Sequence, residues 1–159
     1  ISVEIRKEKG ESFSAVKGLL NQYELMYVIA DEKDVVKLRS NYRHDLVYVY
    51  PIKTSKEKIR SAFLDMLDRA NKLKEKPEFY NTLTNTCTTN IVSHVNKISP
   101  KRVPFSLKVL LPAKSDLLAY EIGLIDTNLP FEEARAKYLI NERALKYADS
   151  EDFSRLIRE

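Results

Sequence analysis

One run of residues, 23–30, constrains the fold more than any other part of the chain. Its sequence, Tyr-Glu-Leu-Met-Tyr-Val-Ile-Ala, is apolar on both faces of an extended chain, with Glu24 as the single exception. Aromatic and β-branched residues of this kind are typical of a buried strand with a neighbour on either side. We therefore expect residues 23–30 to form the central strand of a sheet.

Three other segments have the composition of strands, and the turns between them are short. Residues 1–6 alternate apolar and polar side chains, while residues 35–39 and 46–50 are short runs rich in valine, leucine and tyrosine. The polar turns at residues 31–34 and 41–45 are too short to hold the crossover helix that connects parallel strands. The sequence therefore predicts an antiparallel sheet.

The clearest helix is predicted at residues 54–73. Thr54 or Ser55 provides an N-cap, and Pro77 stops the helix. Apolar side chains recur on one face at helical spacing, which predicts that this face packs against the sheet. The face consists of Ile59, Ala62, Phe63, Met66, Leu67 and Ala70.

Most of the remaining chain also has helical periodicity. Residues 103–112, which include Phe105, are expected to be an extended connection limited by their prolines. Further helices are expected at residues 14–20, 115–123 and 131–147, and in the segment that begins near Cys87, and a last turn is expected at residues 153–157.

The order of these elements predicts an α+β fold, a small antiparallel sheet packed against helices. At 159 residues the chain is long enough for one domain, and we expect residues 1–159 to form a single domain with a helical C-terminal region at residues 113–159. The chain starts without methionine and already in a strand pattern, so we expect it to be the later part of a longer domain.

Composition excludes several classes of function. The net charge is +4, but basic and acidic residues alternate and no block of five like charges occurs, so nucleic-acid binding is not expected. Association with an anionic membrane surface stays open. One cysteine and two histidines are too few for a structural zinc site, and the sequence implies neither a metal nor a cofactor. The oligomeric state is left open.

The only cysteine, Cys87, lies in a polar stretch, residues 80–91, that reads as the start of a helix. Asn85 and Thr86 are good N-cap residues, and Thr88 is tolerated in a first turn. Unpaired N–H groups and the helix dipole favour a thiolate there and can hold an oxyanion. The alternative is a small buried residue, as lone cysteines often are, although the many Thr and Asn neighbours argue against a core position.

These features resemble a known family. The stretch 80–90, together with residues 1–11 and the strand and turn at 23–34, is similar to the Lnb N-terminal periplasmic domain family of the bacterial envelope. The family often has Asn-Asn-Cys where this chain has Asn85-Thr86-Cys87, and Thr is an acceptable cap. The resemblance implies a permuted papain-like plan, related to the NlpC/P60 and lecithin:retinol acyltransferase groups, a periplasmic location, and thiol acyl-transfer chemistry at Cys87.

The general base of such a site can lie upstream of this chain or within it. The family's histidine precedes a strand like residues 1–6, so it is expected upstream of this chain. His44 sits at a predicted strand entry beside Asp45 and is the candidate base within the chain. His94 is seven residues after Cys87, about 10.5 Å along a helix axis, which is too far for a base in one straight helix. We interpret His94 as a surface or packing histidine. Candidate cleft-lining residues are Glu4, Arg6, Glu24, Asn90 and His94.

Three functions are therefore predicted. The first is cysteine-dependent acyl transfer, with a lipid acyl group or a lipoprotein as substrate, as in lipoprotein N-acylation. The second is a cell-wall peptide amidase of the NlpC/P60 type, because the same thiol can open an amide. The third is a non-catalytic binding or scaffold domain, which would leave Cys87 buried or without a partner base.

Overall fold

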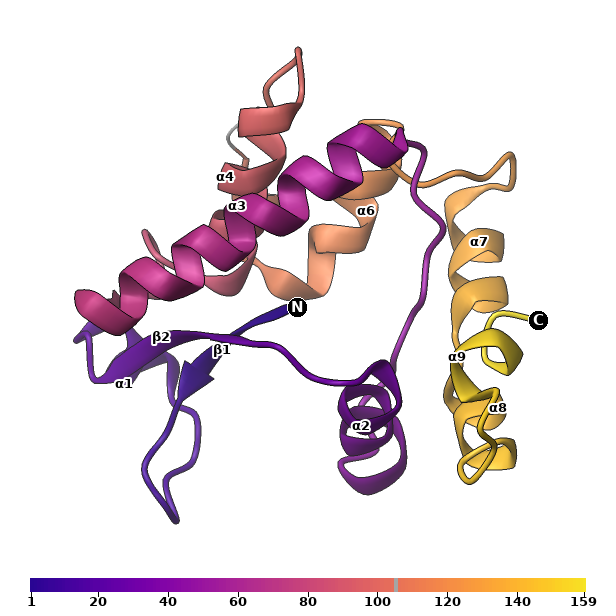
Figure 1. The fold of residues 1–159 in the computed structure, drawn as a ribbon, viewed down its shortest axis with the longest axis horizontal. Coiled ribbons are helices and arrows are strands. Elements are labelled where there is room, and N and C mark those ends of the chain that lie inside the picture. The colour runs from indigo at the N-terminus through magenta and orange to yellow at the C-terminus, as the bar shows by residue number, and fades with distance from the viewer. Residues whose placement is uncertain (105) are drawn as a thin grey trace. The chain divides into compact units, whose positions relative to one another are not determined.

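The computed structural model describes residues 1–104 and 106–159, which divide into two compact units (Figure 1). Unit 1 comprises Ile1–Ile29 and Thr54–Ile122, and unit 2 comprises Ala30–Lys53 and Gly123–Glu159. Unit 1 contains a small antiparallel sheet, and both units are rich in helices. The predicted combination of helices with a small antiparallel sheet is confirmed. Among the described residues, no helix has the length and apolar character needed to cross a membrane.

The sheet of unit 1 has three antiparallel strands in the order β1 (Ser2–Arg6), β2 (Tyr23–Val28) and β3 (Phe79–Tyr80). β2 is the central strand, as its apolar faces predicted. Its register with β1 places Val3 opposite Tyr27. The sequence carries no signal for β3, because two residues show no period and their strand conformation depends on pairing with β2.

The core of unit 1 lies on one side of this sheet, and we call it the sheet core. Tyr23 is its most buried large side chain, with 0% exposed. Its hydroxyl accepts a hydrogen bond from Ser14 N at 2.8 Å and donates to Ser12 O at 3.0 Å, so the one polar atom is satisfied. The sheet core consists of Val3, Tyr23, Leu25, Leu73 and Tyr80, with Ile5, Tyr27, Met66 and Cys87 packed against it.

Two helices, α3 (Lys56–Glu75) and α4 (Cys87–Ile98), contact each other and the sheet (Figure 1). Ser55 caps α3 by accepting a hydrogen bond from Lys58 N, one of the two caps predicted. The predicted apolar face is covered only in part. Met66 of this face packs against the sheet core, beside Leu73 near the end of α3, whereas Ile59 and Phe63, nearer the start of α3, are exposed.

The short helix α1 (Ala15–Leu19) confirms the prediction at residues 14–20 and carries a close approach. A Cβ added at Gly18 would clash with Thr82 Oγ1 and lie 3.2 Å from a ring carbon of Tyr80. Thr82 also donates a hydrogen bond to Ala15 O at 3.1 Å. The absence of a side chain at Gly18 thus allows the loop before Cys87 to dock on α1.

The last part of unit 1 differs from the prediction of an extended connection. Leu107–Leu110 form a short helix, α5, followed by the 3-10 helix η2 (Pro112–Lys114) and by α6 (Ser115–Glu121). Proline is compatible with the first turn of a helix, so prolines near residues 104 and 112 did not require an extended chain. Phe105 lies outside the described residues. α6 confirms the helix predicted at residues 115–123.

Unit 2 begins with a helix where a strand was expected. Residues 35–39 fall in α2 (Glu32–Lys37) and the π-helix η1 (Leu38–Tyr42), so the predicted strand is wrong. The Asp31 carboxylate caps α2 by accepting a hydrogen bond from Lys33 N at 2.8 Å. This cap, with the burial of Val36, outweighs the β propensity of the two valines.

The predicted strand at residues 46–50 and the single helix at 131–147 are also wrong, for one shared reason. Residues 46–50 form no strand, and their one β contact is an isolated bridge from Tyr48 to Leu139. Ile140 N donates to Val47 O, and the Asn141 side chain accepts a hydrogen bond from Val47 N at 2.8 Å. The helix therefore breaks at Leu139 and Ile140, giving α7 (Phe131–Tyr138) and α8 (Asn141–Lys146).

Buried side chains from α2, from α8 and from the end of the chain form the core of unit 2. The final helix, α9 (Phe153–Leu156), confirms the turn predicted at residues 153–157. The buried side chains of this core are Val36, Ile140, Ala144, Phe153 and Ile157.

Candidate functional site

Cys87 is the first residue of α4, as predicted. Thr86 is the N-cap, and its hydroxyl accepts a hydrogen bond from Thr89 N at 3.1 Å. Thr89 Oγ1 in turn accepts from Thr86 N at 2.8 Å, which completes a reciprocal capping box. The first intrahelical bond runs from Asn90 N to Thr86 O, so the N–H groups of Cys87 and Thr88 precede it and point out of the first turn.

The amides and hydroxyls around Cys87 hold the loop that leads into α4. Asn81 Oδ1 accepts hydrogen bonds from Leu83 N and Thr84 N, which closes the turn. Asn85 donates to Phe79 O at 2.9 Å. Asn90 Nδ2 donates to Asn85 Oδ1 at 2.7 Å and to Thr86 O at 2.9 Å, so one buried amide fixes both residues before the cysteine.

The thiol itself sits at the boundary between the sheet core and solvent. Cys87 is half-buried and packs against the sheet core. The Thr88 hydroxyl oxygen lies 3.9 Å from the Cys87 sulfur. Burial, with a smaller contribution from Cys87, raises the pKa of the Tyr80 hydroxyl. Cys87 thus combines a packing contact with a position at the helix start, features of both interpretations drawn from the sequence.

Loss of the helix cap gives a measurable expectation. Replacing Thr86 by alanine removes the hydroxyl that accepts from Thr89 N, and we expect unfolding free energy to fall by about 1–2 kcal/mol. Thr86→Ser keeps the hydroxyl and is the control, expected to lie close to the parent chain. Urea unfolding followed by circular dichroism measures both, and equal stability of Thr86→Ala and Thr86→Ser would contradict the capping role.

A second cluster, buried between α3, α4 and β2, centres on His94. Its side chain is 4% exposed, with Nδ1 2.5 Å from Asp65 Oδ2 and Nε2 2.6 Å from the Tyr27 hydroxyl. Tyr27 OH also lies 3.3 Å from Asn90 Oδ1. His94 is therefore a packing histidine, as interpreted from the sequence, but one held in a chain of polar contacts rather than on the helix surface.

The charge state of Asp65 fixes the direction of these hydrogen bonds. Burial alone would raise the pKa of the Asp65 carboxyl, but hydrogen bonds from Lys97 and His94 outweigh burial and lower it. An ionised carboxylate only accepts, so Nδ1 of His94 carries a proton and donates it. Nε2 lies 2.6 Å from the Tyr27 hydroxyl, so both ring nitrogens of His94 have hydrogen-bond partners within the cluster.

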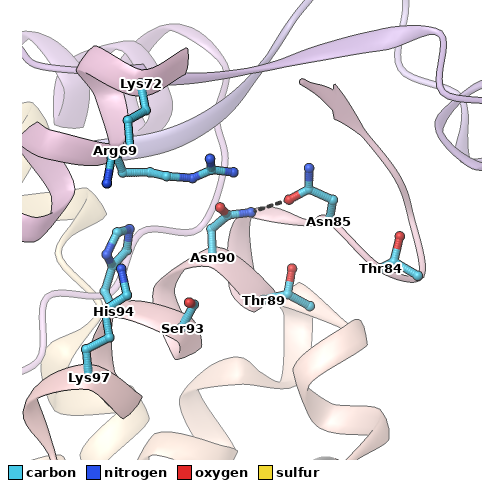
Figure 2. A pocket seen from close by; sticks show the side chains of 9 residues that line it. All are labelled: Arg69, Lys72, Thr84, Asn85, Thr89, Asn90, Ser93, His94 and Lys97. Atoms are coloured by element: carbon cyan, nitrogen blue, oxygen red, sulfur yellow. Dashed lines mark hydrogen bonds between the residues drawn. The ribbon is translucent and has the colours of Figure 1, made fainter. Parts of the chain in front are cut away.

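Beside this cluster, a polar pocket of about 420 Å³ opens between α3 and α4 (Figure 2). We call it the α3–α4 pocket. Arg69 and Lys72 reach it from α3, and Figure 2 shows the Arg69 guanidinium extending towards Asn90 and Asn85. The pocket is lined by Arg69, Lys72, Thr84, Asn85, Thr89, Asn90, Ser93, His94 and Lys97.

The structure brings some of the predicted site residues together and separates others. Asn85, Asn90 and His94 line the α3–α4 pocket, whereas Cys87 contacts the sheet core. Arg6 and Glu24 are cross-strand neighbours that form an exposed ion pair of 3.0 Å.

Glu4 and His44 belong to other surroundings. Glu4, on β1, accepts a hydrogen bond from Ser2 Oγ at 2.6 Å. His44 belongs to unit 2, is exposed, and has a positive φ of 57°. Asp45, the predicted orienting group for His44, lies 3.5 Å from Arg39 in an ion pair.

Most residues of the buried cluster and pocket escaped the sequence analysis, among them three on α3. Asp65, Arg69 and Lys72 recur at spacings of four and three, which places them on one polar stripe of α3. Tyr27 read as a core residue of the central strand. The signal available in the sequence was the match between this stripe and a similar polar stripe on α4 at Asn90, His94 and Lys97.

Within residues 1–104 and 106–159, no group of three or more His, Cys, Asp or Glu side chains is arranged to hold a metal ion.

Comparison with known proteins decides the family. A family model described as the Lnb N-terminal periplasmic domain matches residues 1–113. The chain belongs to this family. The resemblance inferred from the Cys87 stretch and the first strands is thus confirmed, and so is the periplasmic location. The match to the Lnb N-terminal domain ends at residue 113, where the predicted helical C-terminal region begins. No curated protein and no solved structure matches the chain.

Proposed function

We propose that this Lnb N-terminal domain carries a cysteine-dependent acyl-transfer site of permuted papain-like plan, with Cys87 as the nucleophile. The observation that supports the proposal is the position of Cys87 as the first residue of α4, behind the reciprocal capping box of Thr86 and Thr89. The positive end of the helix dipole stabilises negative charge that develops at this position during a reaction, and the half-exposed side chain leaves one side open to a substrate.

The reaction follows from the groups at the helix start. The Cys87 thiolate attacks an acyl carbonyl, a thioester C–S bond forms, and the ester or amide bond of the donor breaks, with its leaving group taking up a proton. The first-turn N–H groups of Cys87 and Thr88 stabilise the oxyanion of the tetrahedral intermediate. An amine or a water molecule then attacks the thioester and regenerates the thiol. A lipid or lipoprotein acyl group is the proposed substrate.

The side chains predicted to surround the oxyanion have supporting roles in this proposal. The Asn85 side chain donates to Phe79 O and accepts from Asn90, and the Thr86 hydroxyl accepts from Thr89 N. These hydrogen bonds orient the backbone of the first turn. Backbone donors fixed in this way need no reorganisation when charge develops. Opening a cell-wall peptide amide at the same thiol is the nearest alternative, since the thioester step is the same.

A non-catalytic binding domain is the second candidate. It is favoured by one observation, that Cys87 contacts the sheet core while the α3–α4 pocket is lined by other residues. The two candidates differ in what they require of the thiol.

Acylation of Cys87 by an activated ester tests the acyl-transfer proposal. We expect the folded chain, incubated with p-nitrophenyl butyrate, to release a burst of p-nitrophenolate and to gain one butyryl group on Cys87 by mass spectrometry. The rate should exceed that of the same chain unfolded in urea, because the helix start exists only in the folded state. Cys87→Ala is the control and should show no burst. A folded chain that reacts more slowly than the unfolded chain would make Cys87 a packing residue.

A further inference from the structure

The α3–α4 pocket has a side-chain chemistry that the acyl-transfer proposal does not use. Its lining contains three cationic side chains, Arg69, Lys72 and Lys97, and no carboxylate. The remaining lining groups are hydroxyls, amides and His94. A wall that combines permanent cations with neutral hydrogen-bonding groups is suited to an anion that has several acceptor atoms.

Each of the three cations also has a carboxylate partner that lies outside the lining. Glu78 accepts two hydrogen bonds of 2.7 Å from Arg69, and this bidentate pair holds the guanidinium plane in place. These two bonds and a further hydrogen bond to Tyr27 use part of the five guanidinium N–H groups, so others are left for a ligand. The pairing therefore positions Arg69 for binding.

Each of the two lysines pairs with a carboxylate, and the two pairs differ in how firmly they hold the lysine away from a ligand. Lys72 pairs with Asp68 at 2.6 Å, and both side chains are more than half exposed. Such exposed pairs are weak because solvent screens them, so Lys72 can turn to an anion at little cost. Lys97 pairs with Asp65 at 2.8 Å and is also more than half exposed. Its partner is tied to His94, which keeps Lys97 at the pocket edge.

Hydroxyl groups complete the pocket between the two helices. Figure 2 shows Ser93 and Thr89 on α4, facing the side from which Arg69 and Lys72 extend. A ligand between the helices would therefore meet donors on several sides. A phosphate group presents three or more acceptor oxygens in different directions, whereas a carboxylate presents two in one plane.

We propose that the α3–α4 pocket is a binding site for a phosphate ester, with Arg69, Lys72 and Lys97 as the anion-binding residues. A volume of about 420 Å³ exceeds the needs of a bare phosphate and leaves room for an organic group attached to it. The ligand is a soluble phosphate ester or the phosphate of a lipid headgroup. The proposal goes beyond the acyl-transfer site, because Cys87 is not among the residues that carry it.

Calorimetric titration of the full chain with glycerol 3-phosphate at low salt tests the soluble form of the ligand. Lys72→Gln should weaken binding about tenfold or more, the loss that goes with one charge-assisted hydrogen bond. Lys74→Gln is the matched control, since it removes the same charge from an exposed position on α3 outside the pocket, and it should leave binding within about twofold of the parent chain. The double variant Lys72→Gln/Lys97→Gln should abolish binding.

Cosedimentation with phosphatidylglycerol vesicles, against phosphatidylcholine vesicles, tests the headgroup form with the same variants. If Lys72→Gln weakens binding to phosphatidylglycerol vesicles and Lys74→Gln does not, the ligand is a lipid headgroup. If Lys72→Gln weakens binding to glycerol 3-phosphate alone, the ligand is a soluble ester. The proposal is overturned if neither probe binds, or if Lys74→Gln weakens binding as much as Lys72→Gln, which indicates general surface charge. Cys87→Ala should bind either probe normally, so failure of phosphate binding and failure of acylation are separate results.

Discussion

Replacing Tyr23 by alanine is expected to cost the chain about 4 kcal/mol or more of unfolding free energy, which is a large part of the stability of a domain this size. Tyr23 has 0% of its surface exposed and lies in the sheet core, so truncation leaves a cavity that the surrounding strands cannot fill. The variant also removes the hydroxyl that forms hydrogen bonds with Ser14 N and Ser12 O. We therefore expect Tyr23→Ala to leave unit 1 largely unfolded at physiological temperature.

Two further variants separate the contributions to this effect. Tyr23→Phe keeps the ring and its stacking on Phe13 but removes the hydroxyl, and it should cost about 1–2 kcal/mol, the value of the two hydrogen bonds. Tyr42→Ala truncates a tyrosine that is 70% exposed and should change stability by less than about 0.5 kcal/mol. Urea unfolding measures all three. Similar midpoints for Tyr23→Ala and Tyr42→Ala would show that Tyr23 is not the centre of the core.

The central strand could be predicted because its signal is local. Apart from Glu24, residues 23–28 are apolar on both faces, and this pattern distinguishes a central strand from an edge strand. The start of α4 at Cys87 could be predicted for a similar reason, since the cap at Thr86 is a short-range interaction. Features that depend on residues within one turn were therefore visible in the sequence.

The errors arise where distant residues decide the local structure. Helix 131–147 breaks because Ile140 and Asn141 bond to Val47, more than ninety positions earlier in the chain. Two valines in α2 favoured a strand, but the packing of Val36 against distant residues such as Ala144 and Phe153 favoured a helix. Local propensity carries no information on such contacts.

The candidate site shows the same division. Cys87 and its caps were found from sequence, whereas the Asp65–His94–Tyr27 cluster joins three elements and has no short motif. Positions 65 and 94 are 29 apart, and positions 27 and 94 are 67 apart. His94 alone, without knowledge of its partners, was indistinguishable from a surface histidine. The matching polar stripes of α3 and α4 are the one sequence feature that indicates how these residues meet.

Removal of Asp65 is expected to have the second large effect on stability. Asp65→Ala leaves the buried Nδ1–H of His94 without its acceptor, and an unpaired buried donor costs about 1–3 kcal/mol. The matched control is Asp68→Ala, which removes a carboxylate from an exposed pair on the same helix and should change stability by less than about 1 kcal/mol. Equal losses in the two variants would show that the contact with His94 contributes nothing.

The charge of Asp65 also predicts how stability changes with pH. Because its pKa is lowered in the folded chain from the usual 3.8, the ionised carboxylate contributes stability that is fully present above that value. This contribution should be lost as the pH falls from 3.8 through the lower pKa of the folded state. Asp65→Asn keeps an oxygen that accepts from His94 but has no charge to titrate, so it isolates this effect. Urea unfolding of the two chains from pH 6 to pH 2.5 should therefore give a free-energy difference that shrinks below pH 3.8, and a difference that stays constant across this range would mean that Asp65 is not stabilised as a carboxylate by His94 and Lys97.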